Sequence, residues 1–330
     1  MRKRTLVLVA SLLALTLLAG CSGGQQQTSP GANYPEKPIN YVIPWSPGGG
    51  SDVMGRMVAD IIQQNKFLPQ PLVVVNKPGG SGAVGMNEVA QKKGDPYTII
   101  GVVSGQISTP ITTGAEVKAS TFKPIAALAL DEFFLLVKPE SEFQTLQDVI
   151  DYAKANPGKL TMGGTGTGSE DHMCAGLLMD AAGIQVEYIP FDGGGEVMSA
   201  LLGGHVQVAW ANPSECASQL KGGLVRVLGV MAPERTKTYP DIPTFKEQGV
   251  DAVFQQIRAI SGSPDMPDYA VEVIAEALKK VSESERWQKE YIEKNALTSR
   301  YLGPEEYGQA IAEAEKQYTE ILTNLGLVKK

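Results

Sequence analysis

The feature that most constrains this chain is an apolar strand, a glycine-rich turn and a helix start, a unit that occurs four times. The first turn is Pro44–Trp45–Ser46–Pro47–Gly48–Gly49–Gly50–Ser51–Asp52, and comparable turns occupy 78–82, 163–169 and 192–195. Glycine lets a ligand approach bare N–H groups, and the first N–H groups of a helix attract anions. One such turn alone indicates only a flexible connection. Four of them predict an anion-binding edge.

Strands and helices alternate, which predicts an α/β protein with mostly parallel sheets covered on both faces. Ligands of such sheets bind beyond the carboxyl ends of the strands. If the chain forms two lobes, with a change near Lys138–Pro139, the four helix starts face one cleft that suits a small polyanion. The expected strands are 39–43, 72–75, 97–103, 133–137, 160–162, 186–189, 206–211, 225–230 and 253–260. The expected helices are 51–64, a run ending near 93, 145–156, 169–182, 196–202, 214–220, 269–281, 284–294 and 304–325.

The first turn does not have the pattern of a nucleotide-binding loop, and the body of the chain has no catalytic set. The turn is neither a Walker loop nor a GxGxxG fingerprint, and no Gly-x-Ser-x-Gly elbow appears in residues 38–330. Of the two histidines, His205 sits at a turn and is expected to be structural. Adjacent side chains point in different directions, so Glu170, Asp171 and His172 are not expected to bind a metal. We expect neither metal nor cofactor, and binding without catalysis. The alternative is an extracytoplasmic enzyme that holds a phosphorylated or carboxylated substrate in its glycine loops.

The composition fits a globular protein and argues against nucleic acid as a partner. The chain has 330 residues, of which 43% are hydrophobic and 20% charged, as expected for about two domains. The formal net charge is −7, and no basic stripe is interleaved with aromatic residues, so nucleic acid is not an expected partner. The negative total does not exclude an anionic ligand, because local N–H dipoles and one or two basic side chains can outweigh it.

The N-terminus has the pattern of a lipoprotein signal peptide, residues 1–20. A basic start at Arg2–Arg4 precedes the apolar run Leu6–Leu18, and Leu18–Ala19–Gly20–Cys21 resembles a bacterial lipobox. Lipidation of Cys21 would anchor the protein outside the cell membrane, and the composition of 21–37 predicts a flexible tether. Ordinary secretion with an unmodified Cys21 is the alternative. No other apolar run reaches the roughly 18 residues of a membrane span.

Two further cysteines, Cys174 and Cys216, lie in the body of the chain. A disulfide between them is possible in an oxidising compartment, and sequence alone does not establish it. We favour two buried free thiols that act as small hydrophobic residues.

Arg258 is the most informative basic residue, because it lies inside the apolar run 253–260. An arginine in a buried strand is rarely unpaired. One interpretation is a structural pair with a carboxylate of the protein. The other is bidentate capture of a ligand carboxylate. Both interpretations stay open. Asp52 and Arg56, four residues apart on a helix, are expected to form a surface ion pair.

Taken together, these segments resemble the extracytoplasmic receptors of tripartite tricarboxylate transporters, also called Bug-type solute receptors. The likeness covers essentially the whole mature chain. The matching segments are 44–52, Asn76–Lys77–Pro78–Gly79–Gly80–Ser81–Gly82, 152–160, Gly164–Thr165–Gly166–Thr167–Gly168–Ser169, Pro190–Phe191–Asp192–Gly193–Gly194–Gly195, Leu201–Leu202–Gly203–Gly204–His205–Val206 and Pro240–Asp241–Ile242–Pro243–Thr244.

The resemblance implies a two-lobed, type II periplasmic-binding-protein-like (flytrap) fold. Lobe 1 would comprise 38–138 plus 261–330, and lobe 2 would comprise 139–260. Ligand carboxylates in the family are held between loops of both lobes, largely by backbone N–H groups. The ligand-binding residues that this implies here are Ser46, Gly49, Gly50, Ser51, Asp52, Gly80, Ser81, Thr165, Thr167, Ser169, Asp192, Gly193 and Gly194, together with Asn212 and Arg258.

The sequence departs from the family pattern in two places, at Glu170–Asp171 and at 257–262. The second departure, and the segment 211–215, resemble the subgroup associated with tricarboxylates, which favours a citrate-like ligand. The resemblance therefore implies a monomeric receptor that captures a small di- or tricarboxylate and delivers it to integral-membrane permease subunits. A sensory receptor of the same fold is the alternative.

Overall fold

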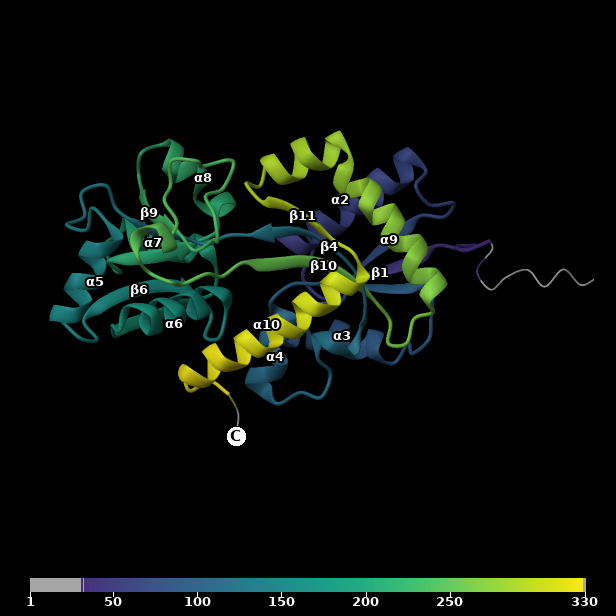
Figure 1. Ribbon diagram of the computed structural model, residues 1–330, viewed down its shortest axis with the longest axis horizontal. Helices are drawn as coiled ribbons and strands as arrows, with labels where there is room; N and C mark the ends of the chain where they lie inside the picture. Colours follow the sequence, from purple (N-terminus) through teal and green to yellow (C-terminus); the bar gives the residue numbers. More distant parts are fainter. Residues whose placement is uncertain (1–30, 32, 329–330) are drawn as a thin grey trace, which may run out of the picture. The chain divides into compact units, whose positions relative to one another are not determined.

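In the computed structural model, which describes residue 31 and residues 33–328, two sheets carry the site (Figure 1). The first has the strand order β11-β4-β10-β3-β1-β2 and the second β7-β6-β8-β5-β9. The strands of the first sheet are β1 Ile39–Ile43, β2 Leu72–Asn76, β3 Thr98–Val102, β4 Lys123–Asp131, β10 Gln256–Gly262 and β11 Thr298–Leu302. Those of the second are β5 Phe134–Val137, β6 Leu160–Thr165, β7 Val186–Phe191, β8 Val208–Ala211 and β9 Arg226–Val230. The signal peptide and Cys21 lie outside the described residues.

Helices cover both faces of both sheets, as the alternating pattern predicted (Figure 1). The helices are α2 Gly50–Asn65, α3 Ala83–Ala90, α4 Gly105–Thr113, α5 Leu146–Ala155, α6 Glu170–Ala182, α7 Gly194–Leu202, α8 Pro213–Lys221, α9 Asp268–Glu283 and α10 Pro304–Asn324. Short 3-10 turns lie at Gly80–Gly82, Ala119–Thr121 and Lys246–Gln248, and a π-helix at Trp287–Glu293. None of the helices in the described part of the chain is long and apolar enough to cross a membrane.

Parallel pairs form one part of each sheet, and the strands at the crossovers are antiparallel. Strand β1 pairs in parallel with β2 and β3, and β6 with β7 and β8. By contrast, β4 and β5, which flank Glu132–Phe133, and β10 all pair antiparallel with their neighbours. The first sheet therefore takes its strands from before Glu132 and after Gln255, and the second from between them. The exact lobes, 38–138 plus 261–330 and 139–260, stay a prediction.

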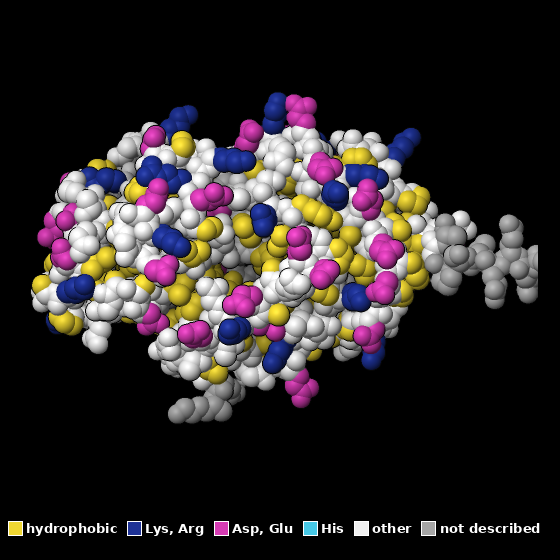
Figure 2. Space-filling model, viewed as in Figure 1, with side chains coloured by type: hydrophobic (Ala, Val, Ile, Leu, Met, Phe, Trp, Pro, Cys, Tyr) yellow, Lys and Arg dark blue, Asp and Glu magenta, His cyan; other side chains and the backbone are white. Residues whose placement is uncertain are grey.

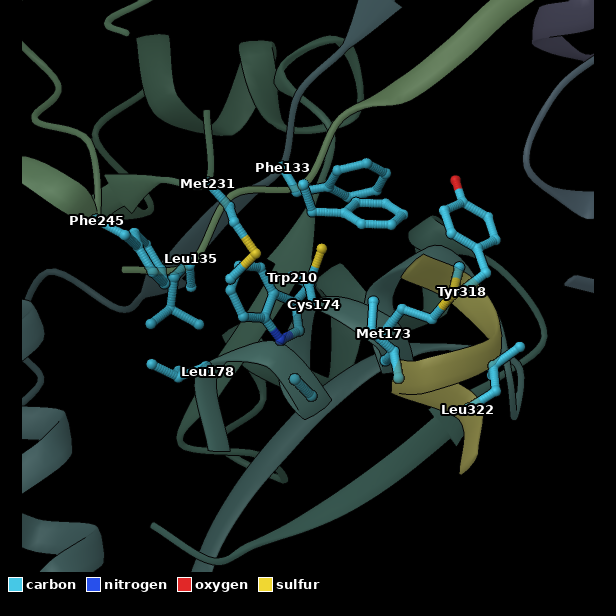
Figure 3. Close-up of a cluster of buried hydrophobic side chains, with 14 of the residues drawn as sticks. Phe133, Leu135, Met173, Cys174, Leu178, Trp210, Met231, Phe245, Tyr318 and Leu322 are labelled. Atoms are coloured by element: carbon cyan, nitrogen blue, oxygen red, sulfur yellow. The ribbon is translucent and has the colours of Figure 1, made fainter. Parts of the chain in front are cut away.

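One apolar core continues from the first sheet to the second. It contains Val42 of β1 and Trp210 of β8, and it extends to Tyr318 of α10, which lies near Met173 of α6 (Figure 3). Burying a large apolar side chain stabilises the fold by about 1.5–3 kcal/mol, so this shared core is a strong link between the sheets. Two further clusters cover the opposite faces, one of each sheet.

Both body cysteines are buried in these cores. Cys174 belongs to the shared core and Cys216 to the cluster beneath α7 and α8. Both thiols are free, as the sequence predicted.

The sequence missed three elements that prove important for the site. Helix α4 was missed because it is short, rich in threonine and interrupted by Pro110. Strand β4 has the sequence Lys-Pro-Ile-Ala-Ala-Leu-Ala-Leu-Asp, whose alanines and leucines favour helices, yet burial between β10 and β11 holds it extended. Strand β11 is a short edge strand. The helix expected at 284–294 is present as a π-helix, in which Trp287 stacks on Tyr291.

Candidate functional site

The first glycine turn leads directly into α2, and Asp52 holds it in place. Gly48 has a φ of 83°, which favours glycine, and its N–H donates to Asp52 Oδ2 at 2.8 Å. Asn76 at the end of β2 donates to Asp52 Oδ1, and Arg56 completes the expected ion pair. Burial alone would raise the pKa of Asp52, but these hydrogen bonds and the Arg56 charge lower it to about 2. Asp52 is therefore an ionised brace of the turn.

Arg258 lies beside the first residue of α2. A Cβ atom on Gly50 would come within 3.0 Å of Nη1 of Arg258, so glycine leaves room for the guanidinium. Nη2 donates to Oδ2 of the fully buried Asp131 at 2.5 Å. Burial opposes the charge of Arg258, but Asp131 outweighs it and raises the pKa of Arg258. The structural pair is thus present, and Nη1 is left facing the helix start.

The second glycine turn packs on α4. Ser81 has a φ of 51°, uncommon for a residue other than glycine, and its carbonyl accepts from Thr109 Oγ1 at 3.1 Å. A Cβ atom on Gly82 would lie 2.7 Å from Gln106 Nε2 and 3.6 Å from the indole of Trp45. Two buried donors, Gln106 Nε2 and Trp45 Nε1, have no hydrogen-bond partner among the described residues. Buried donors are rarely left unsatisfied, so an acceptor that reached these two would recover part of the cost of burying them.

The third turn, between β6 and α6, repeats the design of the first. Asp171 accepts from the N–H of Thr165 at 2.8 Å and from its hydroxyl at 3.0 Å. Ser169 caps α6 by accepting from the N–H of His172, whose ring stacks on Tyr188 at 4.0 Å. Burial raises the pKa of Asp171 to about 7, because neutral donors, rather than a cation, supply its partners.

Glu170, the first residue of α6, links the two sheets. Its Oε1 accepts from the hydroxyl of Ser104, which precedes α4, and from Gln256 Nε2 of β10 at 2.7 Å. Gln256 also donates to Ser104 Oγ at 2.5 Å. The three side chains form a closed polar cluster where the second sheet meets the first.

The fourth turn leads into α7 and lies against Glu215. A Cβ atom on Gly194 would come 2.9 Å from the carboxyl of Glu215, the third residue of α8. Asn212, the N-cap of α8, donates through Nδ2 to the backbone carbonyl of Glu132 at 2.9 Å. The N–H of Asp192 donates to Glu196. The starts of α7 and α8 therefore lie close together.

Some of the expected residues contact one another or a shared partner in the structure, and others form hydrogen bonds only within their own turn. Gly50 meets Arg258, and Gly194 and Asn212 adjoin Glu215. Asp52, Thr165 and Ser169 brace their own turns. The remaining expected residues line the turns themselves and are exposed or half-buried: Ser46, Gly49, Ser51, Gly80, Ser81, Thr167, Asp192 and Gly193.

The charges around Arg258 are mostly negative, which the sequence did not reveal. Burial raises the pKa of Asp131 despite Arg258, and the charge of Glu170 adds to the rise. Desolvation also raises the pKa of Glu215, and the charges of Asp131 and Glu170 act in the same direction. By contrast, acidic and basic side chains are interspersed on the surface shown in Figure 2.

The site can therefore meet a ligand with two kinds of group. Helix starts, Arg258, Gln106 and Trp45 offer donors to an anion. Glu170 and Glu215 offer acceptors to a hydroxyl or an amine. No group of three or more His, Cys, Asp or Glu in the described residues is arranged to hold a metal ion.

Sequence reasoning missed Asp131, Ser104, Gln106 and Gln256 as parts of this site. Asp131 ends β4, a strand that the sequence did not predict. Ser104 and Gln106 lie at the start of α4, a helix that was also missed, and Gln256 donates a hydrogen bond to Ser104. The available signals were the departure at Glu170–Asp171 and the position of 104–106 directly after the expected strand 97–103.

Comparison with known proteins places this arrangement among solute receptors. The family model described as "Tripartite tricarboxylate transporter family receptor" matches residues 54–327. A Cupriavidus necator protein, "UPF0065 protein in gbd 5'region", is 32% identical over 332 residues, with 100% of this chain and 99% of that protein covered.

Solved structures give the same fold. A TctC solute binding protein from Polaromonas, solved without ligand, has a TM-score of 0.79 and 28% identity, and the match covers 88% of this chain and 99% of that one. MatC from Rhodopseudomonas palustris, solved with bound malate, has a TM-score of 0.70 at 20% identity, over 88% of this chain and 100% of that one. The second likeness shows the fold alone. The expected periplasmic-binding-protein-like fold is confirmed.

Proposed function

Because this chain belongs to the tripartite tricarboxylate transporter receptor family, and is thus a solute-binding receptor and not an enzyme, we propose that it captures a small di- or tricarboxylate outside the cytoplasm and delivers it to an integral-membrane permease. The ligand would bind between lobes 38–138 plus 261–330 and 139–260. Contacts from both lobes would favour the closed state, which the permease recognises. Lipidated Cys21 would anchor the receptor to the membrane, where it would act as a monomer.

The observation that carries this proposal is the set of donors without partners. Gln106 Nε2 and Trp45 Nε1 are buried and unsatisfied within residues 33–328, and Arg258 Nε shares this condition. They adjoin the first two glycine turns, through Gly82 and Gly50. An unsatisfied buried polar group costs about 1–3 kcal/mol, which a ligand carboxylate would recover.

The charges of the site also bear on the choice of carboxylate. A tricarboxylate would bring a third negative charge toward Glu170 and Glu215, whereas a hydroxyl or a neutral carbon there would avoid repulsion. Citrate-like ligands, which the sequence favours, carry such a hydroxyl. We therefore expect the preferred ligand to combine carboxylates at the helix starts with a donor near Glu170. Malate, the ligand of MatC, has this combination and is the first compound to test.

A thermal-shift panel of malate, adipate, citrate, neutral sugars and simple cations tests the proposal. A bound carboxylate at about 100 times its Kd should stabilise the protein by about 2.7 kcal/mol. Recovery of the compound unchanged after incubation separates binding from turnover. If no carboxylate stabilised the protein while a sugar or cation did, the proposal would be overturned.

A further inference from the structure

A cavity lies beside the strands that connect the two sheets, next to β11. It has a volume of about 730 Å³ and is lined by Glu132 and Gln255 at the crossovers and by residues near β11. None of the residues that brace the glycine turns lines it. Its volume falls in the range of small-molecule sites. We call it the Glu132 cavity.

Glu132 is an unusual residue to find on a cavity wall. Its side chain is 1% exposed, and Oε1 accepts from Gln255 Nε2 at 2.9 Å. Oε2 is buried and accepts no hydrogen bond from the described residues. Burial raises the pKa of Glu132 to about 7, and the lowering effects of Thr298 and Gln255 do not compensate. A carboxyl group in this state gains from any donor that reaches it.

The adjacent residue, Asp131, has a cationic partner that Glu132 lacks. Asp131 is equally buried, but Arg258 supplies it with a cation at 2.5 Å. No described arginine or lysine forms an ion pair with Glu132, although Arg235, Lys237 and Arg300 all line the same cavity. A ligand ammonium would supply the missing counter-charge.

The lining also holds cations that can bind a ligand carboxylate, although two further acids, Glu234 and Glu293, line the cavity as well. Lys237 and Arg300 are exposed and have no ion-pair partner among residues 33–328, so they are available to an anion. Leu130, Ile292 and Leu297 add apolar walls, against which methylene groups can pack.

From these contacts we infer that the Glu132 cavity binds a small amino acid, with its ammonium group on Glu132 Oε2 and its carboxylate on Lys237 and Arg300. This second site is separate from the carboxylate site at the glycine turns, and it does not depend on the proposed function of that site. Water alone would fill the cavity without supplying a counter-charge to Glu132.

Isothermal titration with 4-aminobutyrate, 5-aminopentanoate and 6-aminohexanoate tests the inference. The matched probes butyrate, pentanoate and hexanoate lack the amine, and the corresponding alkylamines lack the carboxylate. At least one amino acid should bind tenfold or more tightly than both of its matched probes, because each charge has a partner in the cavity. Equal binding of amino acid and matched carboxylate, or no binding of any amino acid, would overturn it.

Substitutions assign the binding to the cavity. Glu132→Gln keeps the size of the side chain and should weaken amino acid binding at least tenfold. Arg300→Gln changes an exposed residue, so it should fold normally and also weaken binding. Glu272→Gln, an exposed glutamate on α9 away from the cavity, should leave the affinity unchanged. If instead Gly50→Ala weakened amino acid binding and neither cavity variant did, the probe would occupy the glycine-turn site and the inference would be wrong.

Discussion

The turns before α2 and α6 are held in the same way, but the pKa values of the two aspartates that hold them are shifted in opposite directions. Each is tied by an aspartate near the helix start, Asp52 accepting from the Gly48 N–H and Asp171 from the Thr165 N–H. Asp52 has Arg56 as a cationic partner, and its pKa falls to about 2. Asp171 is buried among neutral donors, and its pKa rises to about 7. The presence or absence of a neighbouring cation, rather than the geometry of the turn, therefore decides whether the aspartate is ionised.

The two turns also differ in what lies opposite them. The first faces the guanidinium of Arg258 across Gly50, whereas α6 begins with Glu170. We therefore expect the first turn to supply most of the attraction for an anionic ligand. Glu170 would select the uncharged or donating part of the same ligand.

Of the changes to the two turns and their partners, removing Arg258 should lower the free energy of unfolding the most. Arg258→Ala leaves the charge of Asp131 buried without a partner, which should lower the free energy of unfolding by about 3–5 kcal/mol. Arg56→Ala, which removes an exposed cation, should lower it far less. Urea denaturation of both variants measures the difference.

The double variant Arg258→Met with Asp131→Leu provides the control. It removes both charges at once, so most of the lost stability should return. If the double variant were as unstable as Arg258→Ala, the pair would not be the reason for the loss.

The two braces should give opposite pH dependences of stability. The pKa of Asp52 is lowered, so its contribution is present above about pH 4 and is lost as the pH falls toward 2. The pKa of Asp171 is raised, so its contribution is present below about pH 4 and is lost as the pH rises through 7. Asp52→Asn should flatten the acid window by on the order of 1 kcal/mol, and Asp171→Asn, whose pKa is shifted further in a fully buried site, should flatten the window from 4 to 7 by up to about 4 kcal/mol.

Denaturation curves at intervals between pH 2.5 and 8 provide the measurement. Glu132, whose pKa is also raised to about 7, titrates in the same window as Asp171, so Asp171→Asn removes only part of that slope. A flattened acid window in Asp171→Asn, with the window from 4 to 7 unchanged, would show that the two environments have been assigned the wrong way round.

The sequence predicted the repeated units well because their signals are local. An apolar run, a glycine turn and an amphipathic run place α2, α6 and α7 within a residue or two of their observed starts. The Asp52–Arg56 pair follows from helical spacing alone and is present, but Asp52 is buried, so the pair is not the surface pair that was expected. The free, buried state of Cys174 and Cys216 is also as predicted.

The sequence predicted the site less completely, because its partners are brought together by long-range pairing. Asp131 meets Arg258 through the antiparallel pairing of β4 with β10, two strands that lie 127 residues apart at this contact. Strand β4 has a helix-like composition, so no local pattern indicates it. Ser104 at the start of α4 contacts Glu170 at the start of α6, 66 residues further along the chain. Burial and partner identity, which set the pKa of Asp171 and Glu132, are likewise properties of the folded state.

Gly50→Ala tests most directly whether the first turn and Arg258 form the ligand cradle. The added methyl group would lie 3.0 Å from Arg258 Nη1 and displace the guanidinium, while alanine fits the helix start. Gly308→Ala, on α10 and outside the four glycine turns, is the matched control, because a Cβ atom there has only an ordinary van der Waals contact with Pro124 at 3.4 Å. Calorimetric titration of the best carboxylate should show at least a tenfold loss of affinity, about 1.4 kcal/mol, in Gly50→Ala and no change in Gly308→Ala. Equal affinity in both variants and the wild type would contradict the account.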